Sequence, residues 1–386
     1  MKRIKYYSQI DRQFSVHPVC AILGARQVGK TTISKKYIEQ IGGEYTIFDL
    51  ENPTDLARLE NPMIALEKLE DQIILIDEIQ FKPDLFKVLR VLVDQKKNRK
   101  FLILGSASRE LIKQSSETLA GRIGYIELPP FSLNEAKDIK KLWLRGGFPL
   151  AYLANTDDKS YLWRQGYIKT FLEKDISNLG FNIPPQQMRR FWLMLAHYHG
   201  QTFNASEIGR SLGTSDNSVR KYLDILAGTF MVRVLQPWFE NLKKRQVRSP
   251  KIYFRDSGIL HALVGIESYD DLHNNPKFGS FWEGFALEEV IRILDANSED
   301  CYFWATQANA ELDLFILKHG KRLGFEIKFT DTPKITKSMR IAIEDLKLDS
   351  LSIIYPGDKI FPLDDKVTVY GLETIATGKF ASQHPN

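Results

Sequence analysis

The residues best suited to chemistry form one short motif near the start of the chain. Gly24-Ala25-Arg26-Gln27-Val28-Gly29-Lys30-Thr31 has the spacing G-x-x-x-x-G-K-T, in which backbone N–H groups cradle phosphates. The helix that follows adds its positive end to this cradle. We expect the loop and Thr32 to bind a nucleotide, with Lys30 neutralising the β- and γ-phosphates and Thr31 offering its hydroxyl to Mg²⁺. The alternative is an ordinary glycine-rich turn.

A second candidate site lies at the end of an apolar run. Ile73-Ile74-Leu75-Ile76 is followed directly by Asp77-Glu78. At the end of a strand, Asp77 can hold Mg²⁺ through a water, and Glu78 can polarise an attacking water. A switch that only binds nucleotide would need just the first acid, so the pair favours hydrolysis. The alternative is a solvated strand end.

Two further residues are candidates for contact with the nucleotide. Ser106 follows the apolar run 101–104 and is placed to contact the γ-phosphate or to align the water. Its alternative role is to cap a helix. Arg122, in Leu-Ala-Gly-Arg at 119–122, could stabilise transition-state charge on its own nucleotide or on that of a neighbouring subunit. Its alternative is a plain surface arginine.

The elements that must position these residues follow from the apolar pattern. Short apolar runs at 19–23, 45–50, 73–76, 101–104 and 125–128 predict strands, and residues 29–40 and 81–95 read as helices. Alternating strands and helices indicate a parallel sheet covered on both faces. The sequence therefore predicts an α/β fold for the first third.

With these motifs, residues 15–130 resemble an AAA-type P-loop ATPase. Leu-Ile-Asp-Glu-Ile-Gln at 75–80, Leu-Pro-Pro-Phe-Ser-Leu-Asn-Glu at 128–135 and Gly-Gly-Phe-Pro at 146–149 resemble one prokaryotic family of such ATPases. Its members carry a C-terminal domain of unknown function with a nuclease-like fold. The resemblance implies ATP as the nucleotide, because the loop itself does not distinguish ATP from GTP.

The middle of the chain has the pattern of a helix-turn-helix. A short helix is predicted at 204–212, a turn at 213–215 and a second helix at 216–226. With a strand at 231–235, this segment resembles a winged-helix domain, and Ser218, Arg220 and Lys221 would face outward. Residues 233–255 hold seven Lys or Arg and one acid, with Trp238 and Phe239 among them. DNA is therefore a candidate partner, and a protein-binding winged helix is the alternative.

The last third carries a candidate second catalytic site. Asp313 on one predicted strand and Glu326-Ile327-Lys328 on the next resemble the PD-(D/E)xK nuclease fold. Glu283, in Phe-Trp-Glu-Gly, matches the helical acid of the family. The resemblance implies that Glu283, Asp313 and Glu326 hold Mg²⁺ and that Lys328 activates water. Alternating exposed charges are also normal on strands, so an inactive protein-interaction domain is the alternative.

Composition sets the remaining limits. The 386 residues carry a formal charge of +5 and two cysteines, which excludes a disulfide framework and fits a reducing cytoplasm. No apolar run is long enough to predict a membrane span. We expect three parts: a P-loop ATPase (1–150), a helical and winged-helix-like part (151–248) and a nuclease-like α/β part (249–386). The predicted function is ATP hydrolysis linked to DNA, the alternative a signalling or assembly switch, with a homo-oligomer or another protein as further candidate partners.

Overall fold

The computed structural model describes residues 3–69, 73–95, 99–106, 117–239, 246–376 and 380. These residues form two compact units. The N-terminal unit comprises Met1–Pro130 with Gly228–Phe230, and the C-terminal unit comprises Phe131–Ala227 with Met231–Asn386. Residues 131–150, which were expected to belong to the ATPase part, therefore lie in the C-terminal unit.

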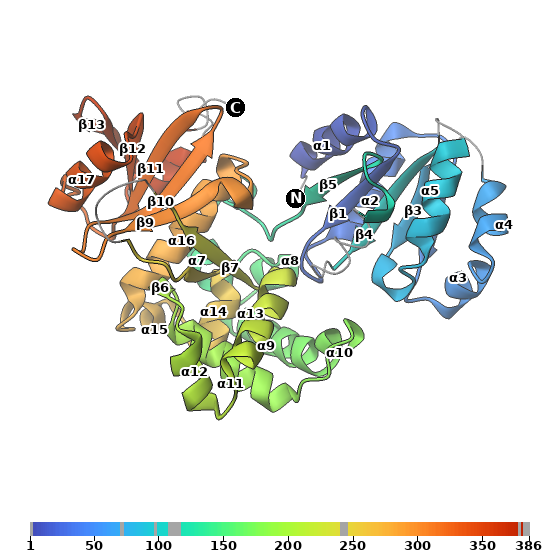
Figure 1. Ribbon diagram of the computed structural model, residues 1–386, viewed down its shortest axis with the longest axis horizontal. Coiled ribbons are helices and arrows are strands. Elements are labelled where there is room, and N and C mark those ends of the chain that lie inside the picture. Colours follow the sequence, from blue (N-terminus) through green and yellow to red (C-terminus); the bar gives the residue numbers. More distant parts are fainter. Residues whose placement is uncertain are drawn as a thin grey trace. The chain divides into compact units, whose positions relative to one another are not determined.

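The N-terminal unit is built on a parallel five-stranded sheet (Figure 1) in the order β2-β3-β4-β1-β5. Its strands are β1 (Val19–Leu23), β2 (Tyr45–Asp49), β3 (Ile73–Asp77), β4 (Lys100–Gly105) and β5 (Ile123–Glu127). Its helices are α1 (Ile4–Phe14), α2 (Lys30–Ile41), α3 (Pro53–Arg58), α4 (Pro62–Glu67) and α5 (Leu85–Gln95), with a short 3-10 turn, η1 (Ile79–Phe81).

Side-chain alternation explains why this sheet is covered on both faces. Val19, Ala21 and Leu23 of β1 belong to a core that also contains Leu85, Leu89 and Leu92 of α5. Cys20 and Ile22 of β1 are equally buried but point the other way, and α1 contacts β1 and β5 while α2 contacts β3 and β4. The predicted covered parallel sheet is confirmed.

The C-terminal unit begins with helices. They are α7 (Ile139–Arg145), α8 (Pro149–Tyr152), α9 (Asp157–Thr170), the π-helical turn η2 (Phe171–Asp175), α10 (Ile176–Asn178) and α11 (Pro185–His197). The next elements are β6 (Gln201–Thr202), α12 (Ala205–Leu212), α13 (Asp216–Gly228), β7 (Val232–Pro237) and β8 (Lys251–Phe254). Gly213, with φ 66°, ends α12 in the left-handed conformation that a tight turn between two helices requires.

The rest of the C-terminal unit contains further helices and strands. Its helices are α14 (Ser257–Leu263), α15 (Tyr269–His273), α16 (Phe278–Ile293), α17 (Lys337–Asp345) and α18 (Leu372–Ile375), with the turn η3 (Ser298–Asp300). Its strands are β9 (Cys301–Ala305), β10 (Glu311–Lys318), β11 (Lys321–Ile327), β12 (Ser350–Tyr355), β13 (Ile360–Asp364) and β14 (Val367–Gly371).

One nine-stranded sheet joins the middle of the chain to its end. The order is β13-β14-β12-β11-β10-β9-β7-β8-β6, and β7 pairs with β9 through Gln236 and Tyr302. The expected boundary at 248/249 falls between β7 and β8, which pair as antiparallel neighbours. The middle and final segments therefore share one sheet and one compact unit.

Two simple expectations concern membranes and cysteines. Among the described residues, no helix has the length and apolar character that crossing a membrane requires. Cys20 and Cys301 are both buried free thiols, and burial raises the pKa of each to about 12. Neither thiol is therefore poised for nucleophilic chemistry.

Candidate functional site

The loop after β1 has the backbone shape of a phosphate cradle. Gly29 (φ 97°) and Gln27 (φ 64°) adopt left-handed conformations just before α2 begins at Lys30. A Cβ added at Gly29 would meet no atom within 4 Å among the described residues. Lys30 is 4% exposed, and its Nζ donates to the carbonyl oxygens of Gly24 and Ala25, each at 3.0 Å. The ammonium is thus folded over the loop in which a phosphate would bind.

Thr31, at the end of this loop, lies in hydrogen-bond contact with Asp77 at the end of β3. The Thr31 hydroxyl donates to Asp77 Oδ2 at 2.7 Å, and the backbone N–H of Glu78 donates to Asp77 Oδ1 at 2.9 Å. Burial raises the pKa of Asp77, and the hydrogen bond from Thr31 partly opposes this rise. A hydroxyl and a carboxylate are oxygen ligands of the kind that Mg²⁺ prefers. This pair therefore fits the predicted magnesium site.

Glu78 and Ser106 lie close together, and a residue absent from the predicted set connects them. Glu78 follows β3 with φ 53°, and Ser106 follows the neighbouring strand β4. The Nε2 group of Gln80 donates to Glu78 Oε2 and, at 3.0 Å, to Ser106 Oγ. The only sequence signal for Gln80 was its place inside the Leu-Ile-Asp-Glu-Ile-Gln phrase.

The other loop residues predicted to bind the nucleotide have different surroundings. Ala25 and Val28 are buried, while Thr32 is exposed on the first turn of α2. Arg26 forms an ion pair with Glu51 beyond the end of β2, with 2.8 Å between Nη2 and Oε1. The Arg26 side chain is thus held by an acidic partner outside the loop.

Arg122 lies at the opposite end of the strands from the phosphate loop. Its carbonyl oxygen accepts from the N–H of Val19, the first residue of β1, whereas the loop follows the last residue of β1. Its guanidinium forms two hydrogen bonds with Asp94, at 2.6 and 3.1 Å. The structure does not bring Arg122 to the chain's own phosphate loop, because the length of β1 lies between them.

The acids and the lysine predicted in the last third meet on neighbouring strands. Lys328 Nζ lies 2.7 Å from Glu326 Oε1 and 4.0 Å from Asp313 Oδ2. The backbone N–H of Ile327 donates to the same Asp313 oxygen at 2.8 Å. Asp313 and Glu326 are only 6% and 5% exposed, so both acids are buried beneath the more exposed Lys328.

Strand β8 adds two residues to this group that were not among the predicted site residues. Tyr253 donates to Glu283 Oε1 at 2.6 Å. Lys251 Nζ lies 3.8 Å from the same oxygen and forms an ion pair with Glu311. We call these seven residues the C-terminal cluster: Lys251, Tyr253, Glu283, Glu311, Asp313, Glu326 and Lys328.

Burial and like charges perturb the acids of the C-terminal cluster. Burial and the charge of Asp313 raise the pKa of Glu283 to about 7 and that of Glu326 to about 8. Oε2 of Glu326 is buried and has no hydrogen-bond partner in the described part of the chain. Carboxylates suit Mg²⁺; however, no three acidic, histidine or cysteine side chains of the described residues are arranged to hold a metal ion. The donors have the right chemistry, and Lys251 and Lys328 form ion pairs with them.

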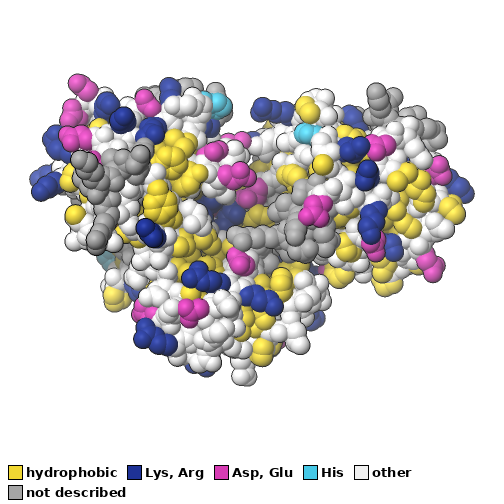
Figure 2. Space-filling view, viewed as in Figure 1, with side chains coloured by type: hydrophobic (Ala, Val, Ile, Leu, Met, Phe, Trp, Pro, Cys, Tyr) yellow, Lys and Arg dark blue, Asp and Glu magenta, His cyan; other side chains and the backbone are white. Residues whose placement is uncertain are grey.

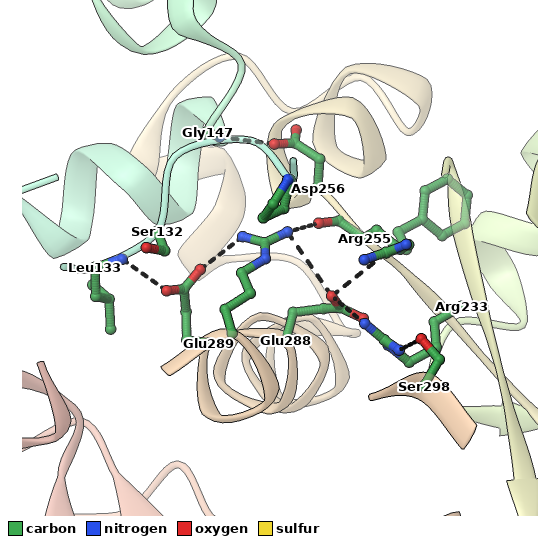
Figure 3. Close-up of polar contacts among 12 residues, drawn as sticks. Ser132, Leu133, Gly147, Arg233, Arg255, Asp256, Glu288, Glu289 and Ser298 are labelled. Atoms are coloured by element: carbon green, nitrogen blue, oxygen red, sulfur yellow. Dashed lines mark hydrogen bonds and ion pairs between the residues drawn. The ribbon is translucent and has the colours of Figure 1, made fainter. Parts of the chain in front are cut away.

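Helix α16 also carries a separate buried ion network, shown in Figure 3. Glu288 is 2% exposed and pairs with Arg233, while Arg255 and Arg292 lie 3.8 and 3.9 Å away. Glu289 accepts from Arg292 at 2.8 Å and from the backbone N–H of Leu133 at 2.7 Å. These two acids are therefore structural, which leaves Glu283 as the helical acid of the C-terminal cluster.

Only some of the residues predicted to contact nucleic acid are exposed. Arg220 and Lys221 are exposed on α13 and Ser218 is half-buried. Of the basic run, Arg233, Lys251 and Arg255 are buried in ion pairs with acids, so counting them as DNA contacts was wrong. Lys243, Lys244 and Arg245 lie outside the described residues. Trp238 packs on Tyr302 and Phe315, at centroid distances of 5.0 and 5.2 Å. Figure 2 shows basic and acidic side chains interspersed on the visible face.

Comparison with family models divides the chain into three matched segments. Residues 16–137 match the AAA domain, residues 136–270 match a domain of unknown function and residues 278–375 match a second one. The first match covers all of the loop and strand-end residues described above. The N-terminal unit thus contains an AAA-like domain with a P-loop.

Comparison with curated proteins shows the family. The chain is 49% identical over 373 residues to uncharacterized proteins of Mycobacterium tuberculosis and Mycobacterium bovis, covering 96% of this chain and 83% of each relative. The chain belongs to their family. A more distant relative of this family, an uncharacterized protein of Haemophilus influenzae, is 27% identical over 210 residues, or 50% of this chain and 52% of the relative.

Solved structures give weaker likenesses. A Walker-type ATPase of Pyrococcus abyssi has a TM-score of 0.47 and 14% identity, covering 68% of this chain and 95% of that protein. The RuvB Holliday junction branch migration motor of Thermotoga maritima has a TM-score of 0.32 and 15% identity, covering 65% and 92%. These likenesses therefore add nothing to the AAA match of residues 16–137.

Proposed function

We propose that the N-terminal unit binds ATP and hydrolyses it. The observation that carries this proposal is the hydrogen bond between Thr31 and Asp77, beside the adjacent Glu78. It joins the hydroxyl of the phosphate loop to the carboxylate of the strand end, which are the two protein groups that P-loop ATPases use at Mg²⁺. The geometry of Gly29 and Lys30 provides the amide cradle and the cation for the phosphates.

Each side chain has a separate task in this proposal. Lys30 would exchange its carbonyl partners for the β- and γ-phosphates, and Thr31 and Asp77 would hold Mg²⁺, which neutralises charge on the phosphates. Glu78 would accept a proton from the attacking water. Ser106 would contact the γ-phosphate or the water from the neighbouring strand. Arg122 would act only at the nucleotide of a neighbouring subunit, since the length of β1 separates it from the phosphate loop of its own chain.

Acid-to-amide substitution tests the hydrolysis. Glu78→Gln keeps size and shape but removes the base, so we expect ATP binding to persist and turnover to fall by about 10²–10⁴-fold. Titration with a non-hydrolysable ATP analogue and phosphate release measure the two properties, and GTP in parallel tests base preference. Glu60→Gln, an exposed acid of the same unit, is the matched control. Unchanged turnover in Glu78→Gln would remove Glu78 from this role.

We propose as a second function that the C-terminal unit acts on nucleic acid. The element order α16-β9-β10-β11-α17-β12 and the meeting of Asp313, Glu326 and Lys328 on neighbouring strands support the PD-(D/E)xK-like interpretation. The order α11-β6-α12-α13-β7-β8, with a β6-β8-β7 sheet, supports a winged helix that would contact DNA.

Incubation with plasmid DNA decides between cleavage and an inactive domain. Wild-type protein with Mg²⁺ or Mn²⁺ should release cut products, and Asp313→Asn should not. Asp345→Asn, at the end of α17 and outside the C-terminal cluster, is the control. Absence of products in wild type, or products that persist in Asp313→Asn, would favour the alternative, a nucleotide-dependent switch whose last domain only binds a protein.

A further inference from the structure

Gln80 occupies a position that neither nucleotide motif explains. We propose that Gln80 is a positioning residue for ATP hydrolysis, which orients the carboxylate of Glu78 and links it to Ser106. The inference rests on the proposed hydrolysis by the N-terminal unit and names a residue that controls it.

The hydrogen bonds around Gln80 join the ends of two adjacent strands. Its Nε2 group donates to Glu78 Oε2 and to Ser106 Oγ, the latter at 3.0 Å. Ser106 Oγ itself lies 3.5 Å from the same oxygen of Glu78. One amide group thus connects the acid after β3 with the hydroxyl after β4.

The chemistry of the partners fixes the orientation of the amide. A carboxylate only accepts hydrogen bonds, so the NH₂ group of Gln80 must face Glu78. An amide nitrogen has two N–H groups, and the two acceptors, Glu78 and Ser106, use both of them. The donor capacity of Gln80 is therefore fully committed to the two residues assigned to the attacking water.

The remaining oxygen of the amide shows that this orientation is imposed. Oε1 of Gln80 is buried and has no hydrogen-bond partner within the described residues. Leaving a buried acceptor unpaired costs about 1–3 kcal/mol, so the amide keeps its two donor bonds at the expense of its oxygen.

The backbone supports the same conclusion. Glu78 adopts a left-handed conformation, φ 53°, although it is not glycine. The 3-10 turn Ile79–Phe81 follows at once, with Ile79 fully buried. This turn brings Gln80 back toward Glu78. Strained backbone of this kind is found at sites where surrounding contacts over-determine the geometry.

The arrangement leaves one carboxylate oxygen for the water. Gln80 holds Oε2 of Glu78, whereas Oε1 accepts no hydrogen bond from any described residue. Glu78 is half-buried, so solvent reaches it. Fixing one oxygen restricts rotation of the carboxylate and presents the other to the nucleophile, which is the contribution expected of a positioning residue.

Gln80→Met tests the proposal because it keeps the length of the side chain and removes both donors. We expect kcat for ATP to fall about tenfold or more, less than the loss in Glu78→Gln, with an unchanged Kd for a non-hydrolysable analogue. Gln80→His, which retains one N–H donor, should lie between wild type and Gln80→Met. The melting temperature of each variant reports whether it folds.

The double variant separates positioning from a structural role. If Gln80 acts through Glu78, Gln80→Met should have no further effect on kcat in a Glu78→Gln background. An equal fall of kcat in both backgrounds, or an unchanged or raised kcat in the single variant, would overturn the proposal. Absence of ATP turnover in wild type would instead defeat the proposed hydrolysis itself, so the two failures are distinguishable.

Discussion

Gly24, the first glycine of the phosphate loop, lies directly against the carbonyl group of Leu128. A Cβ at Gly24 would be 2.3 Å from Leu128 O, and the N–H of Leu128 donates to Leu23 O at 2.7 Å. Arg3 adds a second link, since its guanidinium donates to Val28 O at 3.3 Å and to Pro129 O at 3.0 Å. The phosphate loop is therefore braced by the segment that leaves the last strand of the N-terminal unit.

Gly24→Ala should disrupt the contact between the phosphate loop and Leu128. The new methyl group would meet backbone rather than a flexible side chain, so relief requires the loop or Leu128 to move, at about 1–3 kcal/mol. We expect a lower melting temperature of the N-terminal unit and weaker ATP binding. Gly166→Ala is the matched control, because a Cβ there meets nothing among the described residues and a helix favours alanine. Equal behaviour of the two variants would show that the contact with Leu128 is unimportant.

Breaking the ion network of α16 should strongly lower the stability of the C-terminal unit. Glu288 is 2% exposed and faces three arginines, so Glu288→Gln leaves buried positive charge uncompensated. We expect a loss of about 3–5 kcal/mol in the free energy of unfolding, measured by urea denaturation. Glu299→Gln, an exposed acid nearby, should change it by less than about 0.5 kcal/mol. A small effect of Glu288→Gln would mean that the arginines find other partners.

The nucleotide motifs could be predicted from sequence because their residues are contiguous and end apolar strands. Lys30, Thr31, Asp77 and Glu78 needed only local spacing and the rule that parallel strands end at one edge. Gln80 could not be predicted in the same way. Its link to Ser106 spans 26 residues and exists only once β3 and β4 are paired.

The C-terminal cluster shows the same limit. Asp313, Glu326 and Lys328 followed from alternation along two strands, but Lys251 and Tyr253 lie on β8, far away in sequence. Lys251 and Arg233 were counted in the basic run at 233–255, because the charge of a lysine or arginine does not reveal a buried acid partner. Only the pairing of β7 with β8 and β9 placed them inside the unit.

The buried acids of the C-terminal cluster predict a pH dependence of stability. The pKa of Glu326 is raised by burial from 4.5 to about 8, so the native state keeps its proton to higher pH than the unfolded chain. The contribution of Glu326 to stability is therefore greatest at low pH and falls as pH rises from about 4.5 to 8. Glu326→Gln, which mimics the neutral acid, should gain stability relative to wild type across this window.

Urea denaturation at pH 5 and pH 8 measures this difference. Glu344→Gln, an exposed acid of α17, should run parallel to wild type at both values. A difference between Glu326→Gln and wild type that stays constant between pH 5 and 8 would contradict the raised pKa of Glu326.

The exposed face of α13 gives the sharpest test of DNA contact. Arg220→Glu with Lys221→Glu replaces two exposed cations at the start of the second helix of the helix-turn-helix. If these side chains neutralise phosphates, DNA binding should weaken. The negative slope of log K against log salt should also become shallower, by about 0.9 for each lost contact. Fluorescence anisotropy of a labelled duplex across a salt series measures both quantities. Lys159→Glu with Lys169→Glu, on α9, makes the same change of net charge away from that helix. An equal loss in both pairs would show that only overall charge matters, and an unchanged slope in the α13 pair would exclude phosphate contact by this helix.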